Sequence, residues 1–187
     1  LASFFTFLYL RNFRLSKVSS IYGALIFGFS PFILTWGEEQ VNTPHSVIWL
    51  PLILFSIEKF LKEGKSRYLA IAAASVAFSV FAGFPQTTIY LLIFAFSYLA
   101  FRAKALRTAK LKILQTLGAF FVGIWLAAIQ LVPSLELYAN SLRSQVALTA
   151  TLKDFLLPVS SLLTFLSPDF FGNPATWNFF RGGRALY

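Results

Sequence analysis

Two apolar blocks and one tight turn make up residues 66–104, SRYLAIAAASVAFSVFAGFPQTTIYLLIFAFSYLAFRAK. The blocks cover residues 68–84 and 88–101, the turn between them is GFPQ, and basic residues stand at both outer ends. An α-helix needs about 20 mainly apolar residues to cross a hydrocarbon core of ~30 Å. The stretch therefore predicts two antiparallel membrane-spanning helices, because helices are the usual way for a chain to satisfy its backbone groups in lipid.

The same pattern continues on both sides of this hairpin. Residues 18–36 and 47–61 precede it, residues 113–133 follow it, and residues 1–10 resemble the end of a further helix. The chain contains no Met and begins inside an apolar run. We therefore expect a fragment with at least five complete spans and a truncated first one.

The composition supports a membrane protein. Hydrophobic residues make up 57% of the chain and charged residues only 12%, whereas soluble domains average about 25% charged residues. The absence of Cys excludes disulfides, thiolate chemistry and Cys-based metal sites. The net charge of +9 would suggest a nucleic-acid partner in a soluble protein. Here its distribution indicates membrane topology instead, so we expect no nucleic acid.

Basic residues alternate from loop to loop. Lys and Arg number three in 11–17, four in 59–67 and five in 102–112, with none in 37–46 or 84–87. By the positive-inside rule, the three basic loops are expected in the cytoplasm and the other loops outside. Trp36, Trp49 and Trp125 lie near the expected outer ends of their spans, as interfacial anchors do.

The chain changes character after Pro133. Charges are scattered, Pro and Gly recur, and the apolar stretch FLLPVSSLLTFL at 155–166 is too short to span a membrane. We expect an all-α fold, with a polytopic transmembrane helix bundle at 1–133. Residues 134–187 should form an outward-facing region of loops and interfacial helices.

Glu38 and Glu39 form an acidic pair in the expected outward loop GEEQVNTPHS. A carboxylate there could act as a general base or hold a divalent cation, but a solvated loop fits the pair as well. His45 lies close enough in sequence to join the same site, and a structural interfacial role is its alternative. No zinc-ligand spacing, Gly-rich phosphate loop or nucleophile elbow is present.

Two amides stand at expected outer ends. Gln86 follows Gly83 and Pro85 in an outward turn, where its side chain could bind a sugar hydroxyl or cap backbone groups. Gln130 lies inside the outer end of the last span. We expect Gln86 and Gln130 to share one polar cavity with Glu38, Glu39 and His45.

Glu136 and Arg143 follow seven residues apart and would share a face if this segment is helical. Arg143 is the first cation that the chain places on the expected outer side. A guanidinium can bind a lipid-linked phosphate through two parallel donors. Pairing with Glu136 or with lipid headgroups is the alternative.

Five stretches in this order resemble the bacterial YfhO-like membrane proteins, a family with the GT-C glycosyltransferase architecture. They are FSPFILTW (29–36), HSVIWLPLILFSIEKFLK (45–62), AGFPQTTIY (82–90), AIQLVPSLELYANSLRS (128–144) and LSPDFFGNP (166–174). The resemblance covers nearly the whole chain. It implies a multispan enzyme of the bacterial cytoplasmic membrane.

Such an enzyme takes a sugar from a polyprenyl-phosphate donor and transfers it to an envelope polymer or a lipid on the outer face. In that architecture the principal acidic residue lies in the first outward loop, which would lie upstream of Leu1. Glu38 and Glu39 match a later loop, so they are second choices for the catalytic residue. The substrate-binding candidates are His45, Gln86, Gln130, Glu136 and Arg143.

Two other functions fit the sequence. A transporter or flippase for a lipid or sugar would place ionisable residues midway through its spans, whereas Glu58 and Lys59 lie near an expected cytoplasmic end. A noncatalytic membrane scaffold is the third class. The expected partners are membrane lipids, the polyprenyl-phosphate sugar donor and the envelope acceptor.

The expected topology can be tested by single-Cys labelling, because the chain has no Cys of its own. A Cys at Gln40 should react with a membrane-impermeant maleimide in intact cells, since its loop carries no basic residue. A Cys at Ser66 should be protected until the membrane is opened. The opposite labelling pattern would invert the topology.

Overall fold

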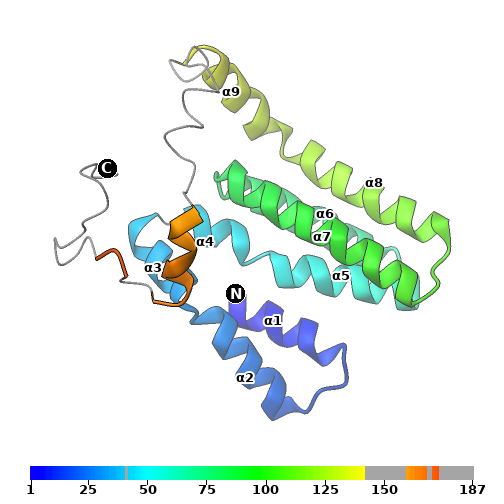
Figure 1. Cartoon of the computed structure of the whole chain (residues 1–187). Helices are drawn as coiled ribbons and strands as arrows, with labels where there is room; N and C mark the ends of the chain where they lie inside the picture. Colours follow the sequence, from blue (N-terminus) through cyan, green and yellow to red (C-terminus); the bar gives the residue numbers. More distant parts are fainter. Residues whose placement is uncertain (41, 142–158, 168–169, 173–187) are drawn as a thin grey trace. The chain divides into compact units, whose positions relative to one another are not determined.

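The computed structural model describes residues 1–40, 42–141, 159–167 and 170–172. The regular elements in these ranges are all helical, which confirms the predicted all-α fold (Figure 1). In chain order they are α1 (Ala2–Arg11), α2 (Lys17–Gly28), α3 (Pro31–Glu39), α4 (Asn42–Val47), α5 (Leu50–Glu63), α6 (Arg67–Phe81), α7 (Pro85–Ala105), α8 (Lys110–Leu126), α9 (Ala128–Ala139) and the 3₁₀ helix η2 (Val159–Phe165).

The chain divides into two compact units, Leu1–Glu136 and Leu137–Tyr187. The first unit contains α1 to α8 and most of α9. In the second unit, η2 forms within the short apolar stretch 155–166, and the rings of Phe170 and Phe171 meet edge to face at 5.0 Å.

Local sequence signals explain where several helices begin and end. Ser16 caps α2, because its hydroxyl accepts a hydrogen bond from the Ser19 backbone N–H at 3.1 Å. Pro31 and Pro85 occupy the first positions of α3 and α7, where a missing N–H costs nothing. Gly64 ends α5 in the left-handed conformation (φ 71°) that glycine adopts readily.

The number of spans is smaller than the sequence suggested. Three helical segments are long and apolar enough to cross a membrane, namely Lys17–Glu39, Asn42–Glu63 and Pro85–Ala105. The pair α8 and α9 makes a fourth if it is one bent span. The predicted span 68–84 is instead the 15-residue helix α6, which is shorter than the ~20 residues that a crossing needs. The described part of the chain thus supports three or four spans rather than five.

Residues 113–133, which the sequence predicted to be one straight span, belong to two helices that meet at a bend. The chain bends by 64° between α8 and α9, around Ala127, and α9 then continues through Pro133 to Ala139. A bend of this size makes the pair either a broken span or a re-entrant segment. The sequence predicted that this helix ends at Pro133, but α9 continues past it.

Within the first unit the helices form a layer in the order α2, α1, α5, α6, α8, and α7 packs against α5 and α6 (Figure 1). The core lies where α5, α6, α7 and α8 meet. It includes the fully buried side chains of Ile53, Ile57, Val76 and Phe120. The outward faces are apolar too: Ile129 is 80% exposed and Phe121 69% exposed. Large exposed apolar side chains on many helices fit a bundle surrounded by lipid.

Helices α6 and α8 approach closely at Gly123. A Cβ atom added there would lie 2.5 Å from the Ala73 carbonyl oxygen and 2.8 Å from Val76 Cβ. Lipid is as apolar as a side chain, so helices in membranes associate largely through such close packing of small residues. Gly123 is therefore a point on which the α6–α8 contact depends.

The three basic loops meet at one end of the bundle, called the basic end below. Lys62 of α5 donates to the backbone carbonyl of Asn12, in the α1–α2 loop, at 3.4 Å. Lys112, at the start of α8, donates to the Leu61 carbonyl at 2.8 Å. The loops with many basic residues thus share one end, as the charge alternation requires. Which side of the membrane this end faces remains a prediction.

A buried carboxylate holds the basic end together. Glu58 of α5 has no exposed surface, and its two oxygens accept hydrogen bonds from the Arg102 guanidinium of α7, one of them from Nε at 2.8 Å. Lys62 Nζ lies 2.8 Å from Oε1, and the Tyr98 hydroxyl donates to Oε2 at 3.0 Å. Glu58 is therefore fully engaged by three neighbours.

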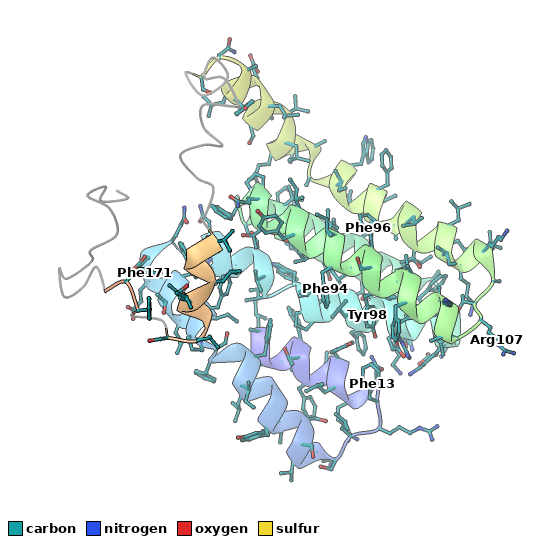
Figure 2. The ribbon with its side chains drawn as sticks, viewed as in Figure 1. Phe13, Phe94, Phe96, Tyr98, Arg107 and Phe171 are labelled. Carbon is teal, nitrogen blue, oxygen red and sulfur yellow. The ribbon has the colours of Figure 1, made fainter. Side chains whose placement is uncertain are left out.

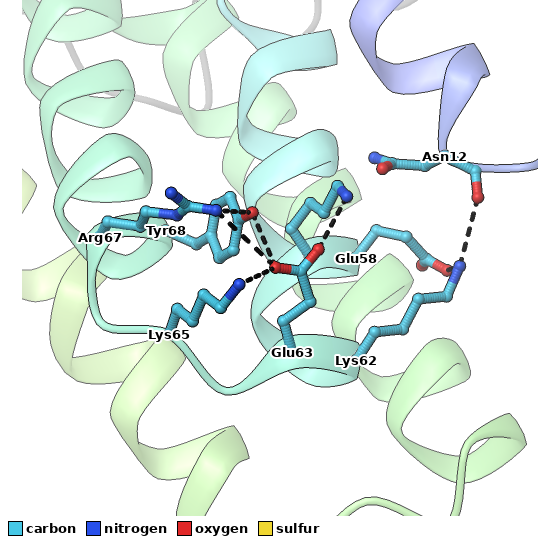
Figure 3. A network of polar contacts seen from close by, with 8 residues as sticks. Asn12, Glu58, Lys62, Glu63, Lys65, Arg67 and Tyr68 are labelled. Atoms are coloured by element: carbon cyan, nitrogen blue, oxygen red, sulfur yellow. Dashed lines mark hydrogen bonds and ion pairs between the residues drawn. The ribbon is translucent and has the colours of Figure 1, made fainter.

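A second network lies on the surface beside it. Glu63 lies within ion-pair distance of Lys59, Lys65 and Arg67, and it also accepts a hydrogen bond from Tyr68 (Figure 3). The four charged side chains are partly or well exposed, whereas Tyr68 is buried. Such pairs contribute little stability compared with the buried Glu58 network.

Hydroxyl groups join the helices toward the opposite end. Ser79 of α6 donates to the Ser46 carbonyl of α4 at 3.1 Å, and Thr88 of α7 donates to the Ser79 carbonyl at 3.0 Å. All three residues are buried. Because each hydroxyl finds a backbone acceptor, these polar groups link α4, α6 and α7 without leaving an unsatisfied donor.

The close contact at Gly123 predicts that a larger residue at this position lowers the stability of the bundle. Gly123→Ala should destabilise the bundle by about 1–3 kcal/mol, because the new methyl group overpacks backbone atoms of α6. Gly118→Ala on the same helix is the control, since no atom lies within 4 Å of its added Cβ. It should be neutral or stabilise the helix by up to about 1 kcal/mol. Thermal unfolding in detergent measures both, and equal effects would contradict the close contact.

The Glu58 network predicts a second effect. Glu58→Leu alone should destabilise the protein by about 3–5 kcal/mol, because it leaves the Arg102 charge inside the bundle without its carboxylate. The double variant with Arg102→Met should recover much of that loss, since neither charge then remains unpaired. Glu63→Gln, on the same helix but in the surface network, should have the smallest effect. A double variant less stable than Glu58→Leu would argue against the pair.

Candidate functional site

A groove of about 560 Å³ lies at the end of the bundle opposite to the basic end. Helices α3, α4, α5 and α7 and the α6–α7 turn supply its walls. We call it the aromatic groove, and its lining is Phe32, Trp36, Thr43, Val47, Leu50, Phe84, Gln86, Thr87, Tyr90, Leu91 and Phe94. Its volume falls within the range of small-molecule sites, and a mainly apolar lining with a few polar groups is typical of such sites.

Helix α7 supplies one wall of the groove and also connects it with the rest of the bundle (Figure 2). Phe94 lines the groove. Two residues farther along, the Phe96 ring lies 5.4 Å from the Phe120 ring of α8. The Tyr98 ring then lies 6.2 Å from the Tyr9 ring of α1. At about 100° per residue, Phe96 falls on the face of α7 opposite to Phe94, and Tyr98 falls within about 40° of Phe94. Contacts on two sides of α7 thus hold the groove wall in place.

Gln86 is the predicted site residue that lines the groove. Its Nε2 donates to the Tyr90 hydroxyl at 2.9 Å, one turn farther along α7. The Gln86 carbonyl oxygen and the second amide hydrogen remain available to a ligand. Together with Thr43 and Thr87, Gln86 gives the otherwise apolar groove its polar side.

Gln130 lies beside the turn that precedes α7. A Cβ added to Gly83 would lie 3.7 Å from Gln130 Nε2 and 3.8 Å from Asn42 Nδ2. Gly83 has a positive φ of 80°, so it needs to be glycine for its backbone as well. Two amides from α4 and α9 therefore come together next to Phe84, which lines the groove. Gln130 was predicted from the sequence as a site residue, whereas no pattern in the sequence marks Asn42.

Glu38 and Glu39 are exposed at the end of α3. Residues of a helix are about 100° apart, so Glu39 falls within about 20° of Phe32, which lines the groove. Glu38 falls about 120° away from Phe32. The two adjacent carboxylates therefore stand on different faces of α3, and Glu39 stands on the groove side.

His45 is exposed on α4, between Thr43 and Val47, which both line the groove. At about 100° per residue, His45 falls on the opposite face of this short helix. Of the five residues expected in one polar cavity, Gln86 alone lines the aromatic groove, and the groove is mainly apolar.

The remaining candidates lie farther along the chain. Glu136 is exposed on α9, and Arg143 lies outside the described residues. No group of three His, Cys, Asp or Glu side chains in the described ranges could hold a metal ion. The divalent cation considered from the sequence therefore has no ligand set in that part of the chain.

Glu58 and Arg102 form a buried ion pair that was not predicted from the sequence. Three side chains already occupy the Glu58 carboxylate. A carboxylate so engaged has little capacity to take a proton from a substrate. The pair is therefore structural, and the aromatic groove with Glu39 at its side is the better candidate for a functional site.

Comparison with known proteins agrees with the membrane character of the chain. The family described as bacterial membrane protein YfhO matches residues 1–178 of the 187. No curated protein and no solved structure matched the chain.

Proposed function

The chain belongs to the YfhO family of bacterial membrane proteins, and from that premise we propose that it acts as a membrane glycosyltransferase. In this proposal it transfers a sugar from a polyprenyl-phosphate donor to a cell-envelope acceptor, on the outer face of the bacterial cytoplasmic membrane. The aromatic groove is the observation that carries the proposal, and the architecture would be GT-C-like.

The groove suits the isoprenoid part of such a donor. Its walls consist mainly of aromatic and aliphatic side chains, which can pack against the methyl-bearing units of an isoprenoid. Its polar side, with Thr43, Gln86 and Thr87, can bind hydroxyl groups next to the lipid. A ligand with a long apolar chain and a sugar headgroup fits both parts.

Glu39 is the proposed general base. In the reaction it removes the proton from the acceptor hydroxyl while the acceptor oxygen attacks the anomeric carbon of the donor. The bond from that carbon to the phosphate oxygen breaks, and polyprenyl phosphate leaves with the electron pair. Glu39 is preferred to Glu38 because it stands on the groove side of α3.

The other candidates have supporting roles in the proposal. Gln86, Gln130 and His45 would position sugar or acceptor hydroxyls. Arg143 would bind the donor phosphate, with Glu136 as a competing partner for its guanidinium.

The proposal predicts a large difference between two adjacent residues. Full-length protein in proteoliposomes would be supplied with a panel of undecaprenyl-phosphate-linked hexoses, and sugar transfer would be measured. Glu39→Gln should lower kcat by about 10²- to 10⁴-fold, the usual contribution of a general base. Glu38→Gln should retain kcat within about threefold.

Three outcomes count against the proposal. Equal activity of the two variants would remove Glu39 from the reaction. Movement of the donor across the membrane without sugar transfer would support the flippase alternative. Protein that binds neither donor nor acceptor, yet inserts normally, would support a scaffold.

A further inference from the structure

A second groove lies between α6 and α8, away from the aromatic groove. It has a volume of about 280 Å³ and a nearly apolar lining. We call it the α6–α8 groove, and it is lined by Leu69, Ala70, Ala73, Gln115, Ala119 and Val122. Ala70, Gln115 and Val122 are exposed, so the groove opens on the outer surface of the bundle.

The two walls of this groove begin together at the basic end. Helix α6 starts at Arg67 and α8 starts at Lys110. With a rise of 1.5 Å per residue, Gln115 lies about 7.5 Å along the helix from Lys110. The groove therefore begins within two turns of the end where the basic loops meet. The positive ends of two helix dipoles add to the charge there.

The basic end has more cations than its carboxylates can pair. Glu58 and Glu63 together engage five basic side chains. Around the start of α8, neither Lys104, Arg107 nor Lys110 has a carboxylate at ion-pair distance within the described ranges. Lys112 donates to a backbone carbonyl, and its ammonium group has further hydrogens to donate.

We propose that the α6–α8 groove binds one acyl chain of an anionic phospholipid whose phosphate contacts Lys112. At about 100° per residue, Lys112 falls within about 20° of the groove residue Ala119 on α8, whereas Lys110 falls on the opposite face. Each of three parts of such a lipid has a matching group on the protein. The phosphate meets the remaining hydrogens of the Lys112 ammonium group, and the exposed Gln115 amide can donate to an ester carbonyl of the lipid. The acyl chain lies along the groove from Leu69 to Val122.

A phospholipid explains these features better than free phosphate. Lys112 and the α8 wall of the groove share one face of that helix, and free phosphate would use only the ammonium group. Diffuse attraction to an anionic membrane surface would likewise leave the groove without a role. This site lies on a different surface from the aromatic groove, so it stands whether or not the protein transfers sugar.

Binding of fluorescent phosphatidylglycerol to the detergent-solubilised full-length protein tests the proposal. The wild type should bind it more tightly than fluorescent phosphatidylcholine. Lys112→Gln should lose about fivefold in affinity, since one basic residue near an anionic headgroup contributes about 1 kcal/mol. Lys110→Gln removes the same charge from the opposite face of α8 and should lose less than about twofold.

The groove itself is tested by filling it. Ala70→Phe should lower phosphatidylglycerol affinity by at least fivefold, because Ala70 is an exposed residue of the groove lining. Ala100→Phe, at an exposed position of α7 outside this groove, should leave the affinity unchanged. Circular dichroism and thermal unfolding establish that each variant is folded.

Three results would overturn the proposal. Equal losses for the two charge variants would mean diffuse surface attraction. Unchanged binding by Ala70→Phe would place the acyl chain elsewhere. Competition by glycerol phosphate as effective as competition by unlabelled phosphatidylglycerol would mean that the cations bind phosphate without the groove.

Discussion

The buried contact between Glu58 and Arg102 is the interaction on which the arrangement of the bundle depends. A carboxylate without any exposed surface is tolerated only beside a compensating charge. Helix α7 must therefore lie along α5 at the one register that brings Arg102 to Glu58. The Arg102 guanidinium and the Lys62 ammonium group also lie 5.7 Å and 5.6 Å from the centre of the Phe13 ring. The same contact thus orders the α1–α2 loop.

This register has consequences at the other end of the bundle. Both α5 and α7 are unbroken helices, so fixing their register at Glu58 and Arg102 also fixes Leu50 relative to Leu91 and Phe94. Those three side chains belong to the wall of the aromatic groove. The hydroxyl contacts among Ser46, Ser79 and Thr88 then hold α4 and α6 in place beside it. Contacts at the basic end therefore set the register of the helices, and the opposite end carries the aromatic groove.

The sequence predicted what depends on local composition. The apolar blocks identified the helices, and the alternation of basic loops predicted that residues 11–17, 59–67 and 102–112 share one end. Features that depend on distant residues were missed. Glu58 and Arg102 are 44 residues apart, and no local pattern marks them as partners. A carboxylate on the same helical face as Leu54 and Leu61 was a usable signal of burial. The bend near Ala127 has no Pro or Gly at its centre, and so the sequence suggested one straight span.

The distribution of carboxylates explains why the proposed reaction is placed beside the aromatic groove and not at the basic end. A general base needs lone pairs that are free to accept a substrate proton, and Glu58 and Glu63 both face several cations. Protonating Glu58 would break the buried contacts that hold the basic end. Glu39, on the same face of α3 as Phe32, is different, because no ion pair involves it in the described part of the chain. A protein that uses its strongest charge contacts to set helix register can leave a weakly held carboxylate beside an apolar groove, where proton transfer does not disturb the bundle.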